Sequence, residues 1–199
     1  MTLQKLVDTT FKELKTFNPE ILRIPLRAAY PGTNELEDIF NTNGNAYYQF
    51  STCLMNVLKP KQVVELGGAM GVWDICVLQT LSPDSQLWSI TLPENGLEYS
   101  YVVDKYPNFH PIVDNDLYYR WEGVDLSKTD VWFIDSEHSE MQIRAELEIY
   151  TKYFKKGAIL LFDDIHIEKG MEKVWNELKY EKLDLSDPLH YTGFGICKV

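Results

Sequence analysis

The spacing of apolar residues changes near residue 60 and divides the chain into two parts. In the first part, apolar side chains recur every three or four positions, as on one face of a helix, at Leu3, Leu6, Val7, Phe11 and Leu14. The stretches NPE and YPGTN then interrupt this pattern. A further helix is predicted from Asn45 to Leu58, where Lys59 and Pro60 end it. We therefore expect helices joined by loops over residues 1–60.

From residue 62 onward, short apolar runs alternate with helical patterns. Seven runs predict strands: QVVEL (62–66), QLWSITL (86–92), FHPIV (109–113), DVWFID (130–135), AILLFDD (158–164), EKLDLS (181–186) and GFGICKV (193–199). Helices are predicted between them at residues 72–80, 97–105, 140–154 and 170–179. This alternation predicts an α/β fold, doubly wound, with helices on both faces of a mostly parallel seven-stranded sheet. The last two runs have no helix between them, so we expect an antiparallel hairpin at the C-terminus.

The size and composition are those of an ordinary globular protein. The chain has 199 residues, 45% of them hydrophobic and 25% charged, which suits one domain with a sizeable core. We divide it into an N-terminal helical extension or cap, residues 1–60, and a larger domain, residues 61–199. The net charge of −11 disfavours nonspecific binding to phosphate backbones or anionic lipids. We therefore expect neither nucleic acid nor a membrane as a partner.

Two further features of the sequence favour a cytoplasmic protein. No stretch approaches about 18 consecutive apolar residues, and the N-terminal MTLQKLVDTTFKELK lacks the apolar region of a signal peptide. The cysteines Cys53, Cys76 and Cys197 are odd in number and widely spaced, without the pairing typical of metal sites. Reduced thiols are therefore expected. The sequence is also compatible with a homo-oligomer.

Two predicted strands end in acidic residues. VWFIDSEHSE passes from an apolar run into Asp135, Glu137 and His138, and AILLFDD ends in Asp163 and Asp164. Neighbouring parallel strands bring their carboxyl ends to the same edge of the sheet, where open α/β sheets bind ligands. Carboxylates crowded there are unfavourable unless they share a cation, and oxygen ligands favour Mg²⁺, Mn²⁺ or Ca²⁺. The alternative is an ordinary loop or cap histidine and a turn formed by the two aspartates.

A glycine-rich turn follows the first predicted strand in VVELGGAMGVWD. Glycines here allow a tight turn and close approach of the backbone to a ligand at the start of a helix. The turn is not the dinucleotide fingerprint G-x-G-x-x-G, because Ala69 and Val72 stand where it requires glycine, and it lacks the Gly-Lys-Ser/Thr of a phosphate-binding loop. A tight strand-to-helix turn without a ligand remains the alternative.

Glu65, directly before this turn, is more informative than the glycines. A carboxylate there would repel a pyrophosphate but can hold an ammonium group or hydroxyls. The stretch E-L-G-G-A-M-G resembles the first motif of class I S-adenosylmethionine-dependent methyltransferases, in the E-x-G-x-x-x-G form of small O-methyltransferases. The resemblance implies a Rossmann-like fold with Glu65 near the methionine end of S-adenosylmethionine. It also implies that the turn passes close to the cofactor, through Gly67, Gly68, Ala69 and Gly71.

The acidic strand ends extend this resemblance. Their pattern is similar to that of metal-dependent O-methyltransferases acting on macrolide sugars, and of the rhamnosyl O-methyltransferase or cephalosporin hydroxylase-like group. The resemblance implies that Asp135, Asp163 and Asp164 bind a divalent metal, expected to be Mg²⁺, with Asp135 also beside the cofactor. It further implies that His138 acts as general base, together with Asp135, on a hydroxyl of a small molecule, such as a sugar or polyol.

The residues expected to bind the ribose and the adenine of the cofactor match the family pattern less closely. In the family, the second strand usually ends in an acid that binds the ribose, whereas this chain has Thr91, with Glu94 as a substitute three residues on. Near the third strand, IVDNDL offers Asp114, Asn115 or Asp116 to the adenine amino group, and we favour Asp116.

Other polar and aromatic residues show no comparable pattern. His110, His166 and His190 have no constellation around them and are expected to be structural. Core or lid positions are expected for Tyr47, Tyr48, Tyr118, Tyr119 and Trp121. The stretch Tyr-Tyr-Arg-Trp, residues 118–121, has an acceptor pocket as its alternative role.

Three other functions stay open at this stage. A metal-independent methyltransferase would use the same fold without the cation. A nicotinamide-dependent oxidoreductase is disfavoured by Glu65 and by the missing G-x-G-x-x-G. A non-catalytic binding or interaction protein on a methyltransferase fold is compatible with Thr91 at the position of the ribose acid.

Overall fold

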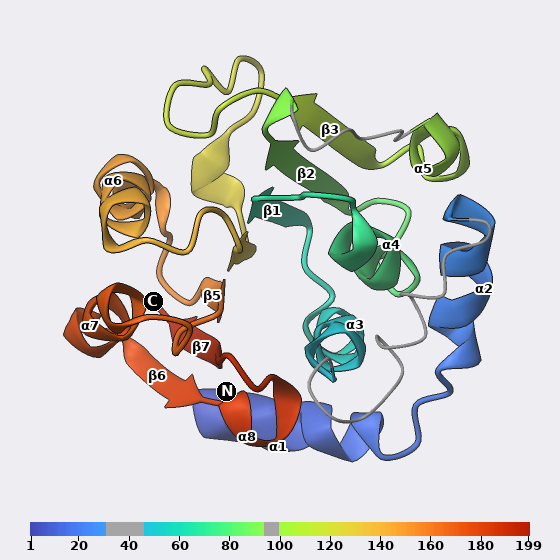
Figure 1. The fold of residues 1–199 in the computed structure, drawn as a ribbon. Coiled ribbons are helices and arrows are strands. Elements are labelled where there is room, and N and C mark those ends of the chain that lie inside the picture. Colours follow the sequence, from blue (N-terminus) through green and yellow to red (C-terminus); the bar gives the residue numbers. More distant parts are fainter. Residues whose placement is uncertain (31–45, 94–99) are drawn as a thin grey trace.

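Seven strands form a single sheet at the centre of the protein (Figure 1). The computed structural model describes residues 1–30, 46–93 and 100–199. The strands are β1 (Gln62–Leu66), β2 (Gln86–Thr91), β3 (Phe109–Val113), β4 (Val131–Ile134), β5 (Ile159–Asp163), β6 (Glu181–Asp184) and β7 (Phe194–Lys198). Their order is β3-β2-β1-β4-β5-β7-β6, and β1 to β5 run parallel. The predicted α/β fold with a mostly parallel seven-stranded sheet is confirmed.

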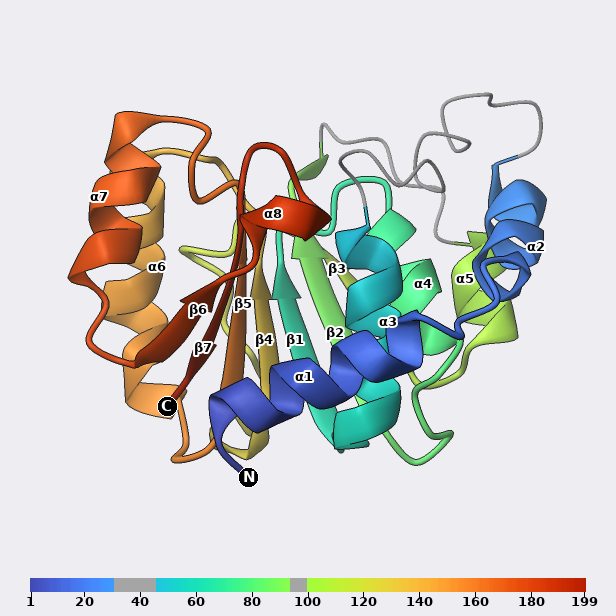
Figure 2. The same cartoon turned by 90° about the horizontal axis from the view of Figure 1, so that it is seen from below.

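Helices cover both faces of this sheet. They are α1 (Leu3–Leu14), α2 (Glu20–Ala29), α3 (Tyr47–Leu58), α4 (Val72–Leu78), α5 (Ser100–Lys105), α6 (Glu140–Tyr150), α7 (Lys169–Glu177) and α8 (Ser186–Leu189). In Figure 1, α6 and α7 lie on one side of the sheet and α3 and α4 on the other, and Figure 2 shows α1 crossing the same face as α3. Within the described ranges, no helix has the length and apolar character that crossing a membrane requires.

Both faces of the central strands are buried, which explains their unbroken apolar runs. Alternate residues point to opposite sides of β4, so that Phe133 belongs to the core under α1, α3 and α4, and Trp132 to the core under α6 and α7. Both side chains are fully buried. The N-terminal helices share the first core with the strands, through Leu3, Leu22 and Phe50.

Helix α6 illustrates how local sequence positions an element of the later site. It begins after Ser139, whose Oγ accepts a hydrogen bond from the Gln142 N–H at 3.2 Å. The helix ends at Tyr150 and is followed by a 3-10 turn to Tyr153, whereas the apolar pattern predicted helix as far as Phe154. The difference is physical, because a tighter last turn satisfies helix carbonyls that have no partner of their own.

The structure also contains two helices that the apolar pattern did not predict. NPE indicated a break, yet it starts α2: Asn18 Oδ1 accepts a hydrogen bond from the Glu20 N–H at 3.1 Å, and Pro19 has the φ angle of a helix start. Helix α8 follows because β6 ends at Asp184, whose Oδ1 accepts a hydrogen bond from the first N–H of α8 at 3.0 Å. The start of the helix predicted at 97–105 lies outside the described residues.

The C-terminal strands form the predicted antiparallel hairpin. Strand β7 pairs antiparallel with β6, and it also pairs antiparallel with β5, with Phe194 opposite Asp163. Because β7 inserts between β5 and β6, the segment before β7 lies at the carboxyl end of β5. Figure 2 shows α8 at this end of the sheet.

Gly67 joins the ends of three strands. Its φ angle is +99°, and a Cβ atom there would lie 2.0 Å from the carbonyl oxygen of Asp135. Its N–H donates a hydrogen bond to the carbonyl of Ile90 in β2 at 2.9 Å. A side chain at this position would therefore push β1 away from β4, in addition to the strain of a left-handed conformation.

Gly67→Ala is expected to lower the free energy of unfolding by about 3 kcal/mol or more, because the methyl group collides with rigid backbone. Gly157→Ala is the matched control, since Gly157 has a φ angle of +87° but nothing within 4 Å of a Cβ atom. There only the conformational strain of about 1–2 kcal/mol applies. Urea unfolding of both variants measures the difference, and equal losses would contradict the contact between the ends of β1 and β4.

Candidate active site

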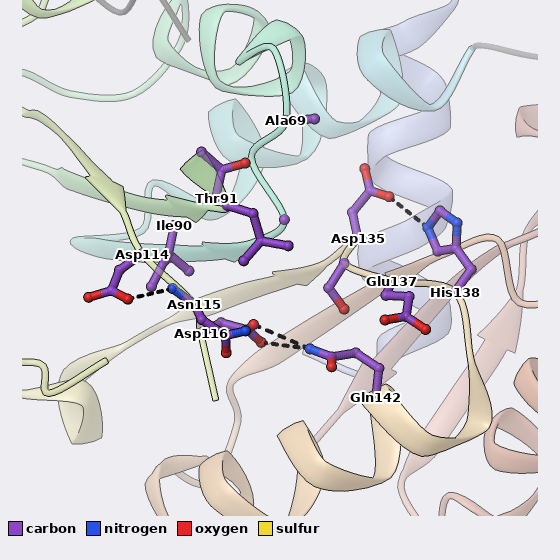
Figure 3. A pocket seen from close by; sticks show the side chains of 13 residues that line it. Ala69, Ile90, Thr91, Asp114, Asn115, Asp116, Asp135, Glu137, His138 and Gln142 are labelled. Atoms are coloured by element: carbon purple, nitrogen blue, oxygen red, sulfur yellow. Dashed lines mark hydrogen bonds and ion pairs between the residues drawn. The ribbon is translucent and has the colours of Figure 1, made fainter. Parts of the chain in front are cut away.

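A cavity of about 420 Å³ opens at the carboxyl ends of the parallel strands. Its walls are the turn after β1, the ends of β2 and β3, and the loop from β4 into α6 (Figure 3). This is the edge at which open α/β sheets bind ligands, and the volume is within the range of small-molecule sites. The polar side chains in the walls include Thr91, Asp116, Asp135, His138 and Gln142.

A second cavity, of about 200 Å³, adjoins the first. Gly67, Ala69 and Asp135 line both cavities, and the second is also lined by Glu65 and Tyr48. The glycine turn and Asp135 therefore stand between two spaces, one beside Glu65 and one beside Asp116. An elongated ligand that occupied both would pass directly over this turn.

Glu65 lies at the second cavity within a buried pair of carboxyl groups. It is 1% exposed, and Ser89 Oγ donates a hydrogen bond to its Oε2 at 2.5 Å. Asp74 of α4 is fully buried beside it. Burial raises the pKa of both groups, and the neighbouring Glu65 raises the pKa of Asp74 further, well above its usual range. Asp74 therefore keeps a proton while Ser89 favours the charged form of Glu65.

Asp116, which follows β3, lines the first cavity and contacts Gln142 of α6. Gln142 Nε2 lies 3.2 Å from both of its carboxylate oxygens, as Figure 3 shows, and 2.7 Å from Glu146 Oε1. The side chains of Asp114 and Asn115 instead accept hydrogen bonds from backbone N–H groups of their own turn.

Glu146 of α6 is a site residue that the sequence analysis missed. It is 1% exposed, and Ser136 Oγ donates a hydrogen bond to it. Its burial, a hydrogen bond with Asp116 and the charge of Asp116 raise its pKa well above the usual range. A sequence signal was present, because Glu146 lies on the same helical face as the buried Ile143 and Tyr150.

The end of β2 carries Thr91 at the first cavity. It is 3% exposed, and its carbonyl accepts a hydrogen bond from the Asp114 N–H at 2.9 Å. The residue expected to replace the missing ribose acid, Glu94, lies outside the described residues.

The acidic strand ends meet around His138, as expected for adjacent strands. His138 Nε2 lies 3.1 Å from Asp135 Oδ1, and its Nδ1 lies 3.0 Å from Asp164 Oδ2. Both ring nitrogens therefore face carboxylates. This arrangement fixes the ring plane without any further group, and either nitrogen can exchange a proton only after its contact with the carboxylate opens.

Asp135 and Asp163 are too close for both to carry a full negative charge without compensation. Asp163 is buried, whereas the side chain of Asp135 is 23% exposed and borders both cavities. Burial raises the pKa of each well above its usual range, and the neighbouring carboxylates raise both further. Asp163 is 4% exposed, and a hydrogen bond links its carboxyl group to that of Asp135. Such a pair must share either a proton or a cation.

Asp164 completes the cluster in an unusual conformation. Its φ angle is +54°, a left-handed conformation that is strained for residues other than glycine. Burial alone would raise its pKa, but hydrogen bonds from His190 and Thr192 and the nearby His138 lower it below the usual value. Asp164 is therefore the carboxylate of the cluster that is charged most readily.

The prediction that His190 has no constellation around it is wrong. His190 Nε2 lies 3.3 Å from Asp164 Oδ1 and 3.7 Å from Asp163 Oδ1. Its ring also packs on Tyr47, with the ring centroids 4.7 Å apart. Asp163, Asp164 and His190 each offer a ligand atom, and these atoms lie within 4.8 Å of one another. No spacing of residues in the sequence indicates this role for His190, because its place depends on the position of β7 beside β5.

His110, His166 and the Tyr-Tyr-Arg-Trp stretch line neither cavity. His110 stacks on Trp88, and His166 Nε2 lies 2.7 Å from Asp184 Oδ2. Trp121 Nε1 donates a hydrogen bond to the Tyr150 hydroxyl at 3.1 Å, so this part of the Tyr-Tyr-Arg-Trp stretch packs against α6.

Comparison with known proteins agrees with the fold and the motifs. A family profile described as a methyltransferase domain matches residues 64–165. Among solved structures, a Staphylococcus aureus protein assigned as a caffeoyl-CoA O-methyltransferase is similar, with a TM-score of 0.63, 18% identity, and coverage of 88% of this chain and 97% of that one. Curated protein sequences give no significant match.

Two further solved structures contain the cofactor or its product. The O-methyltransferase TomG of Streptomyces achromogenes, in complex with SAM, has a TM-score of 0.59, 16% identity, and coverage of 100% of this chain and 99% of that one. An O-methyltransferase of Bacillus cereus, in complex with SAH, has a TM-score of 0.58, 13% identity, and coverage of 94% and 90%. The structural likeness confirms the predicted Rossmann-like fold. The profile spans more than half of the sequence and includes the glycine turn and both acidic strand ends, so the chain belongs to the methyltransferase domain family.

Proposed function

We propose that this protein transfers a methyl group from S-adenosylmethionine to a hydroxyl group of a small molecule, assisted by a divalent cation. One observation carries the proposal: two adjoining cavities meet at Gly67 and Asp135, beside a buried carboxylate cluster. This juxtaposition would place a cofactor along the glycine turn and its methyl group next to the carboxylates.

The residues around the two cavities suit the parts of this cofactor. Glu65 at the second cavity would hold the ammonium group of the methionine end, since the Ser89 hydroxyl favours the charged form of its carboxylate. The ribose would lie against Thr91, with Glu94 as the acid. Asp116 would accept a hydrogen bond from the adenine amino group. The turn through Gly67, Gly68, Ala69 and Gly71 would pass beneath the cofactor, because Gly67 and Ala69 line both cavities.

The carboxylate cluster would hold the cation. Asp135, Asp163 and Asp164 are the proposed ligands, and the proton that Asp135 and Asp163 otherwise share supports this assignment. A bound cation would lower the pKa of the acceptor hydroxyl as a Lewis acid. Mg²⁺ is the cation expected from oxygen ligands.

His138 is the proposed general base, and Asp135 orients it through the contact with Nε2. A positioned base contributes roughly 10²–10⁴-fold to the rate. Its Nδ1 contact with Asp164 must open, or be replaced by a cation on Asp164, before that nitrogen can accept a proton. A metal-independent methyltransferase is the second candidate, since the two carboxylates already fix the ring of His138.

The proposal also covers the class of acceptor molecule and the cellular compartment. We infer a sugar or another polyol as acceptor by analogy with the resembling enzymes, because vicinal hydroxyls suit a bound cation. A reducing compartment such as the cytoplasm is proposed, and the three buried, unpaired cysteines support it. We also propose that the protein works without nucleic acid, in keeping with its net charge of −11.

Asp163→Asn is expected to separate cation binding from cofactor binding. In calorimetry, parent and variant should bind S-adenosylhomocysteine with affinities within about threefold of each other, since Asp163 lines neither cavity. Excess Mg²⁺ or Mn²⁺ should stabilise the parent against heat, by about 2.7 kcal/mol at a hundred times the Kd. The variant should lose this stabilisation. Asp84→Asn, at an exposed loop position before β2, is the control that keeps it.

The possible results of this experiment differ in meaning. A parent that binds neither S-adenosylmethionine nor S-adenosylhomocysteine would overturn the methyltransferase proposal. A parent that binds the cofactor but gains no stability from either cation would establish the metal-independent alternative.

Glu146→Gln is expected to change how stability depends on pH. Because the pKa of Glu146 is raised in the folded protein, folding takes up a proton above the unfolded pKa of about 4.3. The free energy of unfolding of the parent therefore falls as the pH rises toward the pKa of Glu146 in the folded protein, by up to about 1.4 kcal/mol per pH unit. The variant lacks this loss, so its advantage should be absent near pH 4 and grow as the pH rises, until the pH passes the pKa of Glu146 in the folded protein.

Urea unfolding at several pH values measures this difference. Glu148→Gln removes an exposed carboxylate from the same helix and should keep the pH dependence of the parent. A constant difference between Glu146→Gln and the parent at all pH values would show that Glu146 is charged in the folded protein.

A further inference from the structure

The C-terminal hairpin brings a nitrogen ligand to the carboxylate cluster. Strand β7 runs antiparallel to β5, so the chain before β7 returns to the carboxyl end of β5, where Asp163 and Asp164 lie. His190 occupies this returning segment, between α8 and β7, and it is 8% exposed. Figure 2 shows α8 folded over this end of the sheet.

The distances suit one cation between three side chains. Ligand atoms of one cation, each about 2.0–2.3 Å from it, lie at most about 4.6 Å apart. His190 Nε2 lies 3.3 Å from Asp164 Oδ1 and 3.7 Å from Asp163 Oδ1. The Thr192 hydroxyl also lies 2.8 Å from Nε2, so this nitrogen faces oxygen atoms from the hairpin and from the end of β5.

One further observation points to a ligand. Asp163 is 4% exposed, and its Oδ1 accepts no hydrogen bond from the described part of the chain, although it faces His190. A buried carboxylate oxygen without a donor is unfavourable unless a cation or a proton meets it.

His190 is held rigidly in this position. Its N–H donates a hydrogen bond to the Ser186 carbonyl at 2.9 Å, and its carbonyl accepts one from the Gly193 N–H at 3.1 Å. Its ring packs on Tyr47 of α3. A ring fixed at backbone and side chain loses little freedom when it coordinates an ion.

We infer that His190 is a nitrogen ligand of the divalent cation held by Asp163 and Asp164, and that the site therefore prefers a transition metal such as Mn²⁺ to Mg²⁺. Imidazole suits zinc, iron, nickel and copper, whereas carboxylates suit magnesium, calcium and manganese. A set of one imidazole and two carboxylates therefore favours a first-row transition metal such as Mn²⁺, which lies between these groups, over Mg²⁺, which takes oxygen ligands. The inference rests on the proposed function for the role of the cation, but not for its binding. In this mixed site, His190 takes the place of Asp135 as the third ligand beside Asp163 and Asp164. Asp135 then lies next to the cation and orients His138.

Metal binding to the full chain tests this directly, without turnover. Mn²⁺ and Mg²⁺ affinities are measured by calorimetry for the parent, His190→Ala and the control His166→Ala, whose imidazole pairs with Asp184 instead. The parent should bind one Mn²⁺ at least about tenfold more tightly than Mg²⁺. His190→Ala should lose about 10–100-fold in Mn²⁺ affinity and at most about threefold in Mg²⁺ affinity. His166→Ala should match the parent.

Pulsed electron paramagnetic resonance on bound Mn²⁺ identifies the ligand atom. The parent should show coupling to ¹⁴N, which becomes ¹⁵N coupling when the protein contains ¹⁵N-histidine, and His190→Ala should lose it. The isotope exchange shows that the coupled nitrogen belongs to a histidine. Retention of the coupling in His138→Ala excludes the neighbouring His138, which lies 3.0 Å from Asp164, so the assignment stands even where His190→Ala does not fold. An equal loss of both cations in His190→Ala, or no nitrogen coupling in the parent, would overturn the inference.

Binding of S-adenosylhomocysteine to the same samples separates this inference from the proposed function. A protein that binds Mn²⁺ through nitrogen but no cofactor would retain the metal site and lose the methyltransferase proposal. A protein that binds the cofactor, and Mn²⁺ without nitrogen coupling, would retain the methyltransferase proposal with an all-oxygen site.

Discussion

The burial of carboxyl groups at one edge of the sheet is the constraint on which the site depends. Glu65, Asp116, Asp135, Asp163 and Asp164 come from four different strand ends, and all lie at the same edge. Carboxylates removed from water repel one another unless protons, hydrogen-bond donors or cations compensate them. The protein supplies a different compensation at different positions. The pKa of Asp163 is raised by burial and by neighbouring carboxylates, whereas hydrogen bonds and the nearby histidines lower the pKa of the adjacent Asp164.

Close contact between strand ends then turns these acids into one site. The backbone of Gly67 touches that of Asp135, which brings the cavity beside Glu65 next to the cavity beside Asp116. A bulkier residue would separate the two spaces and would also displace Asp135 from Asp163. The geometry for an elongated ligand and the geometry for a cation therefore depend on the same turn.

Much of this arrangement could be predicted from the sequence, because it follows from local patterns. Continuous apolar runs identified the buried strands, and the acids at their ends were expected at one edge of a parallel sheet. His190 could not be found in this way, since its place depends on the insertion of β7 between β5 and β6, a long-range choice with no local signal. Glu146 and Asp74 were missed for another reason: each lies among the buried apolar residues of its helix, which indicates burial, but the sequence does not show which groups surround a buried acid. Tyr47 likewise became part of the site only through the packing of α3.

The charge of the carboxylate cluster also bears on the methyl-transfer step under the proposed function. S-adenosylmethionine carries a positive charge at sulfur, and a cluster of partly charged carboxylates at the end of β4 and β5 favours that charge electrostatically. With His138 as the base, the proton of the acceptor hydroxyl would be held 3.1 Å from Asp135 as the sulfonium charge is lost. The carboxyl groups would therefore face one positive charge both before and after methyl transfer, and would not need to change their protonation.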